Sequence, residues 1–474
     1  MNRASAPVAQ DHSSEVLPYA AQLARFALGL RYEDIPTEVR MRAHSLILDA
    51  LGIALAANKY PFAPQILDGL VTLGGHGKLS VIGRSERLSL RDALTMNGAL
   101  IHGLDYDDTH MNSIVHATAA TLPSVLTVGE HVNASGTELL TSYVVGMEAA
   151  IRLGLVKPFG WHDEGYHATG VVAHFASTLI CGRLLGLSEA QLISAQGIVG
   201  STASASQEFA EEGAWNKRLH PGWGAVAGVT ACHLARSGFV GPSKPYEGRY
   251  GVYRMHLGEA AMADADFKAI SAELGERWEL DEAAIKPYPT CHFTHAAADA
   301  ALELQREHQF AANDVDHMQV VIPDGTLPVV AEPADNKRRP RSEYDGKFSM
   351  HYIAAAALVR GKFDLAELAP ESLSDPAILA LADRVDCSAD PDTRFPEFFS
   401  GGVTIKLRDG RELKRHEPVN RGAGERALSH AEIEEKFRAN VRLVADEAEI
   451  SCLCDHIMQM DKQSGVEFMG GLVR

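Results

Sequence analysis

The feature that most constrains this fold is a helical spacing of apolar residues, rich in Ala, Leu and Gly, that runs from Pro18 to about residue 270. Within the segment 36–58, Pro36 suits a first helical turn. Apolar residues follow it at three- and four-residue intervals: Val39, Ala43, Leu46, Ala50 and Ile53. Further helices are predicted at 137–156, 222–239 and 294–308. Because so many of these residues are small, we expect closely packed and mostly buried helices.

The periodicity changes past residue 310, where strands become the better interpretation. Apolar residues alternate in the segment 401–418 up to Asp409-Gly410, which predicts two strands joined by a two-residue hairpin turn. The segment 316–325 is also predicted as a strand. Between them, the segment 347–361 returns to helical spacing. A smaller region that mixes helices and strands is therefore expected after the helical one.

The C-terminal segment 428–444 predicts one more amphipathic helix. Ser429 suits its N-cap, and Glu432 follows three residues later, as in a capping box. The apolar face of this helix needs a partner that the small strand-containing region does not supply. We therefore expect the tail to pack back on the N-terminal helices.

The length of the chain indicates more than one domain. Its 474 residues exceed the ~250 to 300 at which a single core usually stops growing. The turn-rich stretch 286–289 marks a boundary. The predicted organisation is mostly α, with an all-helical domain over 1–280, a smaller α+β domain over 281–418, and C-terminal helices over 419–474 that return to the first domain.

Composition argues against several classes of protein. The chain is 46% hydrophobic and 22% charged, as ordinary globular proteins are. Its formal net charge of −18 argues against a nucleic-acid partner, which needs a basic surface. The first 16 residues lack a signal-peptide core, and no later segment offers ~18 uncharged apolar residues. The six cysteines form no CxxC pair, which favours reduced thiols. We expect a cytoplasmic protein that does not bind membranes.

The segment 102–116, HGLDYDDTHMNSIVH, concentrates three aspartates and three histidines. Carboxylates and imidazoles together suit a metal, with His102, Asp105, His110 and His116 as conceivable ligands. Their spacing matches no metal-binding motif that coordination geometry explains, such as HExxH or an EF-hand loop. A metal site, a solvated loop and a metal-free substrate site remain open for this cluster, and we favour the last.

Three further stretches add cations and imidazoles beside glycines or prolines. They contribute His167, Lys217 with His220, and Lys286 with His292 and His295. His167 and His220 could instead cap helices, and Lys217 and Lys286 could be solvated charges. Together, the stretches supply the charges that an anionic polycarboxylate requires. The run 336–341, which contains Lys337 and Arg338, is interpreted as a solvated face that could also edge the same cleft.

These motifs, in this order and spacing, resemble the MmgE/PrpD family. The resemblance rests on HGLDYDDTH, GYHATG, KRLHPGWGA, KPYPTCHFTHAAADAAL and KFSMHY, and extends from about residue 18 to 445. The family contains 2-methylcitrate dehydratase, cis-aconitate decarboxylase and iminodisuccinate epimerase. The resemblance implies a lyase or isomerase of a small polycarboxylate that uses no cofactor or metal. It also implies a large helical domain completed by the tail, a smaller α+β lid domain, and a homodimer.

The resemblance also implies a set of site residues in a cleft between the domains: Asp105, Thr109, His116, His167, Lys217, Lys286 and His292. The lysines would stabilise negative charge that develops beside a substrate carboxylate. His116 is favoured as the group that moves a proton, held in place by Asp105 and Thr109. His167 and His292 would bind carboxylate or supply the opposing acid. His295 is a rival of His292.

The same residues serve dehydration, decarboxylation and epimerisation, so the motifs leave the reaction open. A dehydratase of the 2-methylcitrate type is favoured, with a decarboxylase or an epimerase as alternatives. A non-catalytic carboxylate-binding protein with the same fold is the alternative from another class.

Overall fold

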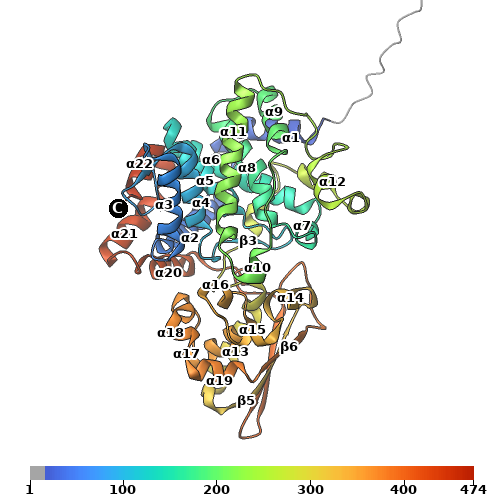
Figure 1. The fold of residues 1–474 in the computed structure, drawn as a ribbon, viewed down its shortest axis with the longest axis vertical. Coiled ribbons are helices and arrows are strands. Elements are labelled where there is room, and N and C mark those ends of the chain that lie inside the picture. The colour runs from blue at the N-terminus through green and yellow to red at the C-terminus, as the bar shows by residue number, and fades with distance from the viewer. Residues whose placement is uncertain (1–16, 474) are drawn as a thin grey trace, which may run out of the picture.

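The computed structural model describes residues 17–473 as a large helical body joined to a smaller body of helices and strands (Figure 1). The N-terminal segment 1–16, for which no signal peptide is predicted, lies outside the described residues. Helices account for 59% of the chain and the sheets are small, so the predicted mostly-α fold is confirmed.

The helical body contains most of the long helices. They are α1 (Tyr19–Gly29), α2 (Thr37–Ala57), α3 (Phe62–Gly74), α4 (Leu90–Ile101), α5 (Ala117–Val132), α6 (Gly136–Leu155), α7 (Gly160–Asp163), α8 (Ala168–Leu184), α9 (Glu189–Val199), α10 (Phe209–Glu212), α11 (His220–Arg236) and α12 (Val252–Leu257). Short antiparallel pairs join β1 (Leu79–Ser80) to β2 (Arg87–Leu88) and β3 (Thr109–His110) to β4 (Ala283–Ala284).

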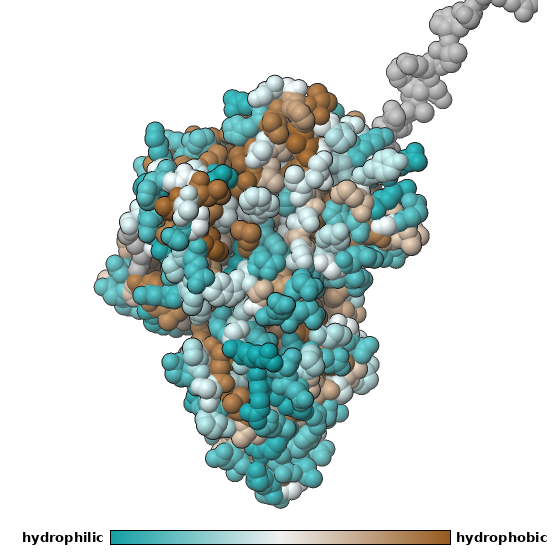
Figure 2. Space-filling model, in the orientation of Figure 1, coloured by the Kyte–Doolittle hydropathy of each residue, from teal (hydrophilic) through white to brown (hydrophobic). Residues whose placement is uncertain are grey.

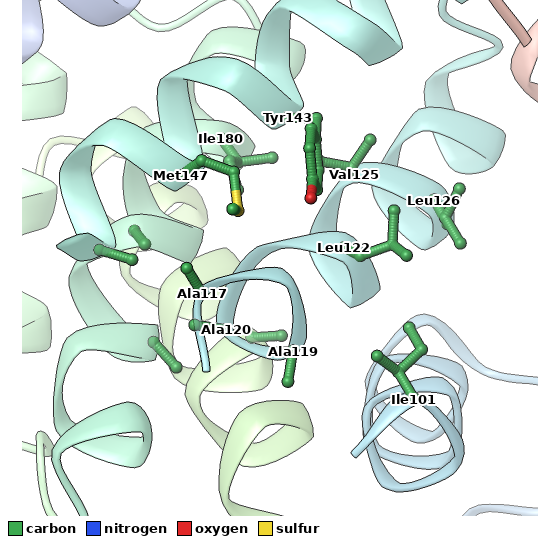
Figure 3. Close-up of a cluster of buried hydrophobic side chains, with 14 of the residues drawn as sticks. Ile101, Ala117, Ala119, Ala120, Leu122, Val125, Leu126, Tyr143, Met147 and Ile180 are labelled. Atoms are coloured by element: carbon green, nitrogen blue, oxygen red, sulfur yellow. The ribbon is translucent and has the colours of Figure 1, made fainter. Parts of the chain in front are cut away.

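Small residues allow the central helices to approach closely. A side chain added at Gly228 of α11 would meet the backbone nitrogen of Thr178 in α8 at 2.8 Å, so only glycine fits there. Apolar side chains fill the space around α5, as the buried group that includes Leu122, Tyr143 and Ile180 shows (Figure 3). The helices are therefore buried on most sides, as the small-residue pattern predicts.

The smaller body has its own apolar core around a four-stranded sheet. Its strands are β5 (Val315–Ile322), β6 (Val385–Ala389), β7 (Gly401–Leu407) and β8 (Glu412–Glu417), in the order β6-β5-β7-β8. Its helices are α13 (His295–His308), α14 (Leu327–Val330), α15 (Ala334–Arg338), α16 (Glu343–Gly346), α17 (Met350–Arg360), α18 (Pro370–Leu373) and α19 (Pro376–Ala382).

The predicted hairpin is present, but its turn is longer than predicted. Four residues, Arg408 to Arg411, separate β7 from β8, and Gly410 adopts a positive φ of 94°. Beyond the Lys406–Glu412 pair, the amide of Leu407 still donates to the carbonyl of Arg411 at 2.8 Å, and the amide of Gly410 donates to the carbonyl of Leu407 at 3.0 Å. The turn therefore needs three residues, Arg408 to Gly410, and the two-residue prediction is wrong. The sheet also contains β6, parallel to β5, which the alternation pattern did not predict.

The C-terminal helices lie against the helical body (Figure 1). They are α20 (His430–Val441), α21 (Glu447–Met458) and α22 (Gly465–Gly471). The Ser429–Glu432 capping box begins α20 as predicted. Phe437 of α20 packs on Gly52 of α2, where an added side chain would meet its ring at 2.8 Å. The apolar core of the large body thus includes residues from both ends of the chain.

Within residues 17–473, no single helix is long and apolar enough to cross a membrane. Only the pair α2 and α3 passes by combined length and composition, with a bend of 83° between them. Hydrophilic side chains cover much of the smaller body in the view of Figure 2, and apolar patches lie on the helical body.

Candidate active site

A cavity of about 200 Å³ lies between the two bodies. Its lining includes all the site residues predicted from the sequence: Asp105, Thr109, His116, His167, Lys217, Lys286 and His292. Most of these residues belong to loops and helix starts of the large body, whereas His292 begins a short turn that leads into α13. The fold thus brings together residues that are far apart in the sequence.

The segment 102–116 is buried rather than solvated, so the solvated-loop alternative is wrong. The chain leaves α4, turns sharply with a positive φ of 50° at Asp105, forms β3, and enters α5 directly after His116. The amide of His116 donates to the hydroxyl of Thr169 at 3.0 Å. These contacts hold the loop against α8 and aim its polar side chains inward.

Asp105 organises the positive charge of the cavity. Its Oδ1 accepts from Lys217 Nζ at 2.9 Å and from Lys286 Nζ at 3.0 Å. Burial disfavours the ionised carboxylate, but the two lysines hold the pKa of Asp105 well below its usual range. Both lysines are buried, so their interpretation as solvated charges is wrong. Two ammonium groups share one carboxylate, which leaves positive charge for an anion.

Hydrogen bonds assign the proton on His116. Its Nδ1 lies 2.9 Å from the carbonyl oxygen of Asp108, which can only accept, so Nδ1 carries the hydrogen and Nε2 carries a lone pair. Burial lowers the pKa of His116 well below its usual value, and the charges of Lys286 and Lys217 lower it further, against the opposing effect of Asp107. His116 is therefore a neutral imidazole, able to accept a proton at Nε2.

His102 is fixed in the same way. Its Nδ1 lies 2.9 Å from Asp107 Oδ2, and both side chains are buried. Because a carboxylate accepts, Nδ1 of His102 carries a hydrogen. His102 is not among the residues that line the cavity, but its ring centroid lies 4.9 Å from that of His116.

His292 is held by Asn420. The amide oxygen of Asn420 accepts from the backbone nitrogen of Phe399 at 3.1 Å, so its Nδ2 donates to His292 Nε2 at 2.8 Å. The hydrogen of the neutral ring therefore lies on Nδ1. Burial, followed by the charge of Lys286, lowers the pKa of His292 to about 3. His295 does not line the cavity and instead contacts the carbonyl of Thr290.

His167 and His220 make a direct contact through their Nδ1 atoms, 3.0 Å apart. Neither side chain caps its helix, so the capping interpretation is wrong for both. Burial, followed by Lys217 and His220, lowers the pKa of His167 well below its usual value. His167 lines the cavity, and His220 supports it from outside the lining.

Phenylalanine rings form the apolar part of the cavity. The ring centroids of Phe293 and Phe399 lie 4.8 Å apart. The ring centroid of Phe395 lies 6.1 Å from that of Phe293 and 5.7 Å from that of Phe399. Phe159 extends this group from the helical body, 5.0 Å from Phe395. Phe159, Phe293 and Phe399 all line the cavity. The cavity therefore offers an aromatic group beside the cations.

Several lining residues were not predicted from the sequence. His162 belongs to α7 and lines the cavity, and burial followed by Lys217 lowers its pKa to about 4. It stands five residues before His167, so a signal was present. Asn420 and the phenylalanines carry no charge pattern, and only the packing of the two bodies brings them to the site.

The predicted solvated face at 336–341 is partly wrong. Lys337 is only 6% exposed, because α15 packs inside the smaller body. Burial lowers its pKa, although Asp345 opposes this effect. Arg338 does behave as a surface residue and pairs with Asp386 at 2.7 Å.

One ring nitrogen from each of His102, His116 and His167 lies within 4.8 Å of the other two. Three imidazoles whose outer nitrogens are hydrogen-bonded are an arrangement that can hold zinc. The ammonium groups of Lys217 and Lys286 oppose this use, because they repel a divalent cation and occupy the nearby carboxylate. The same charges favour an anion, so the cavity suits a carboxylate ligand better than a metal ion.

Comparison with known proteins places this site in a family. The MmgE/PrpD N-terminal domain matches residues 21–264, and the MmgE/PrpD C-terminal domain matches residues 288–456. The chain is 25% identical to the cis-aconitate decarboxylase-like protein oryM of Aspergillus oryzae, over 96% of each chain. It is 27% identical to the cis-aconitate decarboxylase of Homo sapiens, over 87% of this chain and 85% of that protein. Its identity to the 2-methylcitrate dehydratase of Escherichia coli K12 is 23%, over 78% of each chain. The chain belongs to the MmgE/PrpD family.

Proposed function

We propose that this protein is a lyase of a small polycarboxylate, and that it decarboxylates an unsaturated tricarboxylate of the cis-aconitate type. The observation that carries the proposal is the composition of the cavity. Lysines and imidazoles gather around Asp105, and the phenylalanine group lies beside them. Cations suit the carboxylates that remain in the product, and an apolar surface suits the carboxylate that departs.

Decarboxylation uses both parts of such a cavity. The bond between the departing carboxylate and its carbon breaks, carbon dioxide leaves, and the electron pair moves onto the unsaturated skeleton beside a remaining carboxylate. Apolar surroundings favour loss of the charged group as a neutral gas. Lys217 and Lys286 stabilise the charge that develops. An imidazole N–H then supplies the proton that completes the product, and in this proposal His167 or His292 is the donor.

Relatives named cis-aconitate decarboxylase or cis-aconitate decarboxylase-like protein support this reaction, since their alignments cover 87% and 96% of the chain. Dehydration of a 2-methylcitrate-type substrate, the reaction favoured in the sequence analysis, is the second candidate and is supported by the 23% identity to a 2-methylcitrate dehydratase. There the lone pair of His116 Nε2 would take a proton from carbon, and an N–H would protonate the departing hydroxyl. Epimerisation would return the proton to the opposite face.

We also propose that the protein is a homodimer, as the family resemblance implies. Apolar side chains at the end of α11 are exposed, among them Leu234, Phe239 and Val240. An apolar patch over α9 and this end of α11 is visible in Figure 2. Such patches often mark contacts between proteins. Light scattering of the purified protein measures its mass directly, and a monomer would contradict the proposal. The expected cytoplasmic location remains a prediction for cell fractionation.

The proposed reaction is tested by incubating the protein with cis-aconitate, citrate, 2-methylcitrate and iminodisuccinate and detecting products by NMR. We expect carbon dioxide release and a dicarboxylate product from cis-aconitate. Loss of water from 2-methylcitrate without decarboxylation would favour the dehydratase instead. Binding without turnover of any of the four would favour a non-catalytic carboxylate-binding protein. Exhaustive chelation should leave the activity intact, whereas loss that one divalent ion restores would indicate a metal enzyme.

A further inference from the structure

Two imidazoles face each other where two packed helices begin. His167 directly precedes α8, and His220 is the first residue of α11. Their Nδ1 atoms are 3.0 Å apart. The ring centroid of Phe209 lies 5.8 Å from that of His167 and 6.1 Å from that of His220. A hydrogen bond between two neutral imidazoles places one hydrogen between these nitrogens. One ring must therefore donate and the other must accept.

The neighbours of His167 determine which ring donates. The ring centroid of His167 lies 5.5 Å from that of His102 and 6.0 Å from that of His116. Both neighbours carry their hydrogen on Nδ1, because Asp107 and the carbonyl of Asp108 accept it there. Because His116 is neutral, its Nε2 is therefore a lone-pair acceptor.

The buried Nε2 of His167 has no partner among the described residues, and neither has that of His102. A lone pair on His167 Nε2 would leave it and His116 Nε2 as two neighbouring acceptors with no hydrogen between them, which is unfavourable. A hydrogen there supplies the donor. Lys217 also acts on His167 through its charge, but among the described residues its ammonium group makes no hydrogen bond to this Nε2.

His220 is free to be the partner that donates through Nδ1. It is half-buried, so water can reach its ring more easily than that of His167. Its position at the N-terminus of α11 disfavours a positive charge on the ring. The charged and titratable groups that act on it are His102, Lys217 and His174, none of them a carboxylate. A neutral ring with its hydrogen on Nδ1 fits this environment.

We infer that His220 is a positioning residue that holds His167 in the tautomer with its hydrogen on Nε2, and so makes His167 the proton donor of the site. The catalytic consequence rests on the proposed lyase function. When His167 Nε2 gives its proton to the substrate, the hydrogen bond from His220 Nδ1 and the nearby Lys217 ammonium group stabilise the negative charge that forms on the ring. A solvent proton then returns to His167 Nε2, so both rings end neutral in their starting tautomers, and one solvent proton replaces the proton that the product gained.

A matched pair of substitutions tests this role. In His220→Asn, the amide places an N–H near the original Nδ1, so the Nε2–H tautomer of His167 remains accessible. In His220→Asp, the carboxylate only accepts and takes the hydrogen of His167 Nδ1. His167 Nε2 then carries a hydrogen only while the ring is doubly protonated. We expect kcat of His220→Asp to fall as pH rises through the raised pKa of His167, reaching a loss on the order of 10²-fold.

His220→Asn should stay within about tenfold of the parent, with an unchanged pH profile. His233→Asn changes an exposed histidine on the same helix and should match the parent. Equal kcat values and equal pH profiles for the Asn and Asp variants would overturn the inference. Because both substitutions keep a side chain of similar size, thermal unfolding of each checks that the fold survives.

The tautomer itself is measurable without substrate. In the parent protein labelled with 15N-histidine, NMR should show His167 with its hydrogen on Nε2 and His220 with its hydrogen on Nδ1. A spectrum with the hydrogen of His167 on Nδ1 would refute the inference, whatever reaction the protein catalyses. If none of the polycarboxylates reacts, the proposed function fails, and the NMR result still decides the tautomer.

Discussion

At the scale of residues, Asp105 determines how the site holds charge before a substrate arrives. One of its carboxylate oxygens accepts hydrogen bonds from Lys217 and Lys286, and Lys286 also donates to its backbone carbonyl at 2.8 Å. Burial lowers the pKa of Lys286, but Asp105 and Asp107 outweigh this effect and raise it. The ammonium group of Lys286 is thus ionised, and both lysines are already oriented, which reduces the reorganisation needed when an anion binds.

Replacing Lys286 with Met should lower kcat/KM by roughly 10²-fold, equivalent to losing ~3 kcal/mol of charge stabilisation. Steady-state kinetics on the substrate identified by the product screen measures this effect. Lys414→Ala, at an exposed position of β8, is the control and should match the parent. Kinetics of Lys286→Met within a few-fold of the parent would remove this lysine from the mechanism.

Asp108 should make stability depend on pH. Burial, with the nearby charge of Asp107, raises its pKa to about 7, above the ~3.9 of an unfolded chain. Between these values the folded state binds more protons, so this residue lowers stability as pH rises from about 4 to 7. Asp108→Asn has no charge to bury and can still accept from the amide of Thr118. The unfolding free energy of Asp108→Asn, minus that of the parent, should therefore rise by a few kcal/mol between about pH 4 and pH 7 and stay constant at higher pH.

Chemical unfolding of the parent and of Asp108→Asn at pH 5 and pH 8 measures this difference. The exposed Asp316→Asn is the matched control and should follow the parent at both pH values. If parent and Asp108→Asn show the same pH dependence, Asp108 is ionised throughout and the argument from its burial fails.

At the scale of elements, the site depends on where helices begin. His116 directly precedes α5, His167 directly precedes α8, and His220 begins α11. Helix N-termini carry partial positive charge, which lowers imidazole basicity and favours anions. Because α4, α8 and α11 pack closely, a small change in their spacing would move these imidazoles relative to one another.

The contact between α4 and α11 relies on glycines on both sides. A side chain at Gly98 would collide with the backbone of Gly222, and one at Gly222 would meet the Thr95 carbonyl oxygen at 2.6 Å. Gly98→Ala should therefore destabilise the fold by about 1–3 kcal/mol, because neither backbone can yield easily. It should also lower kcat, since α11 carries His220.

Denaturant unfolding measures the effect of Gly98→Ala. Gly29→Ala is the control: it lies in α1 with no atom within 4 Å of an added side chain, so it should be neutral or slightly stabilising. A Gly98→Ala protein as stable as the parent would mean that the two helices can separate without cost.

At the scale of the whole molecule, two apolar cores meet at the cavity, and the C-terminal helices belong to the first of them. The chain therefore crosses between the bodies twice, near the segment 286–289 and again before α20. Lys436 of α20 pairs with Asp49 of α2 at 2.7 Å, and it also donates to the carbonyl of Tyr106, next to Asp105. The tail thus supports the loop that carries the site.

Removing the Phe437 ring should show how strongly the C-terminal helices contribute to the stability of the fold. Phe437 is fully buried between α20 and α2, so Phe437→Ala should cost about 3–5 kcal/mol of unfolding free energy. Thermal and denaturant unfolding measure this loss. Leu443→Ala, at a residue 45% exposed just beyond the same helix, should change stability little. Equal stability of both variants would show that the tail is not part of the main core.

The sequence by itself was sufficient where neighbouring residues determine structure. Helical spacing and the Ser429–Glu432 pair act over a few residues of backbone, and both are present in the structure. The segment 316–325 likewise contains β5. The motifs also predicted a set of site residues, and all of them line one cavity. The roles of these residues stay predictions.

Only the tertiary structure decided matters that depend on distant neighbours. His292 lines the cavity and His295 does not, because Asn420 from the smaller body holds the first ring. Lys337 is buried by the packing of α15, which no local pattern reports. The hydrogen on each imidazole is assigned by partners such as Asp107 and His220. Burial and hydrogen bonding are set by which side chains the fold brings together, and local spacing does not encode these contacts.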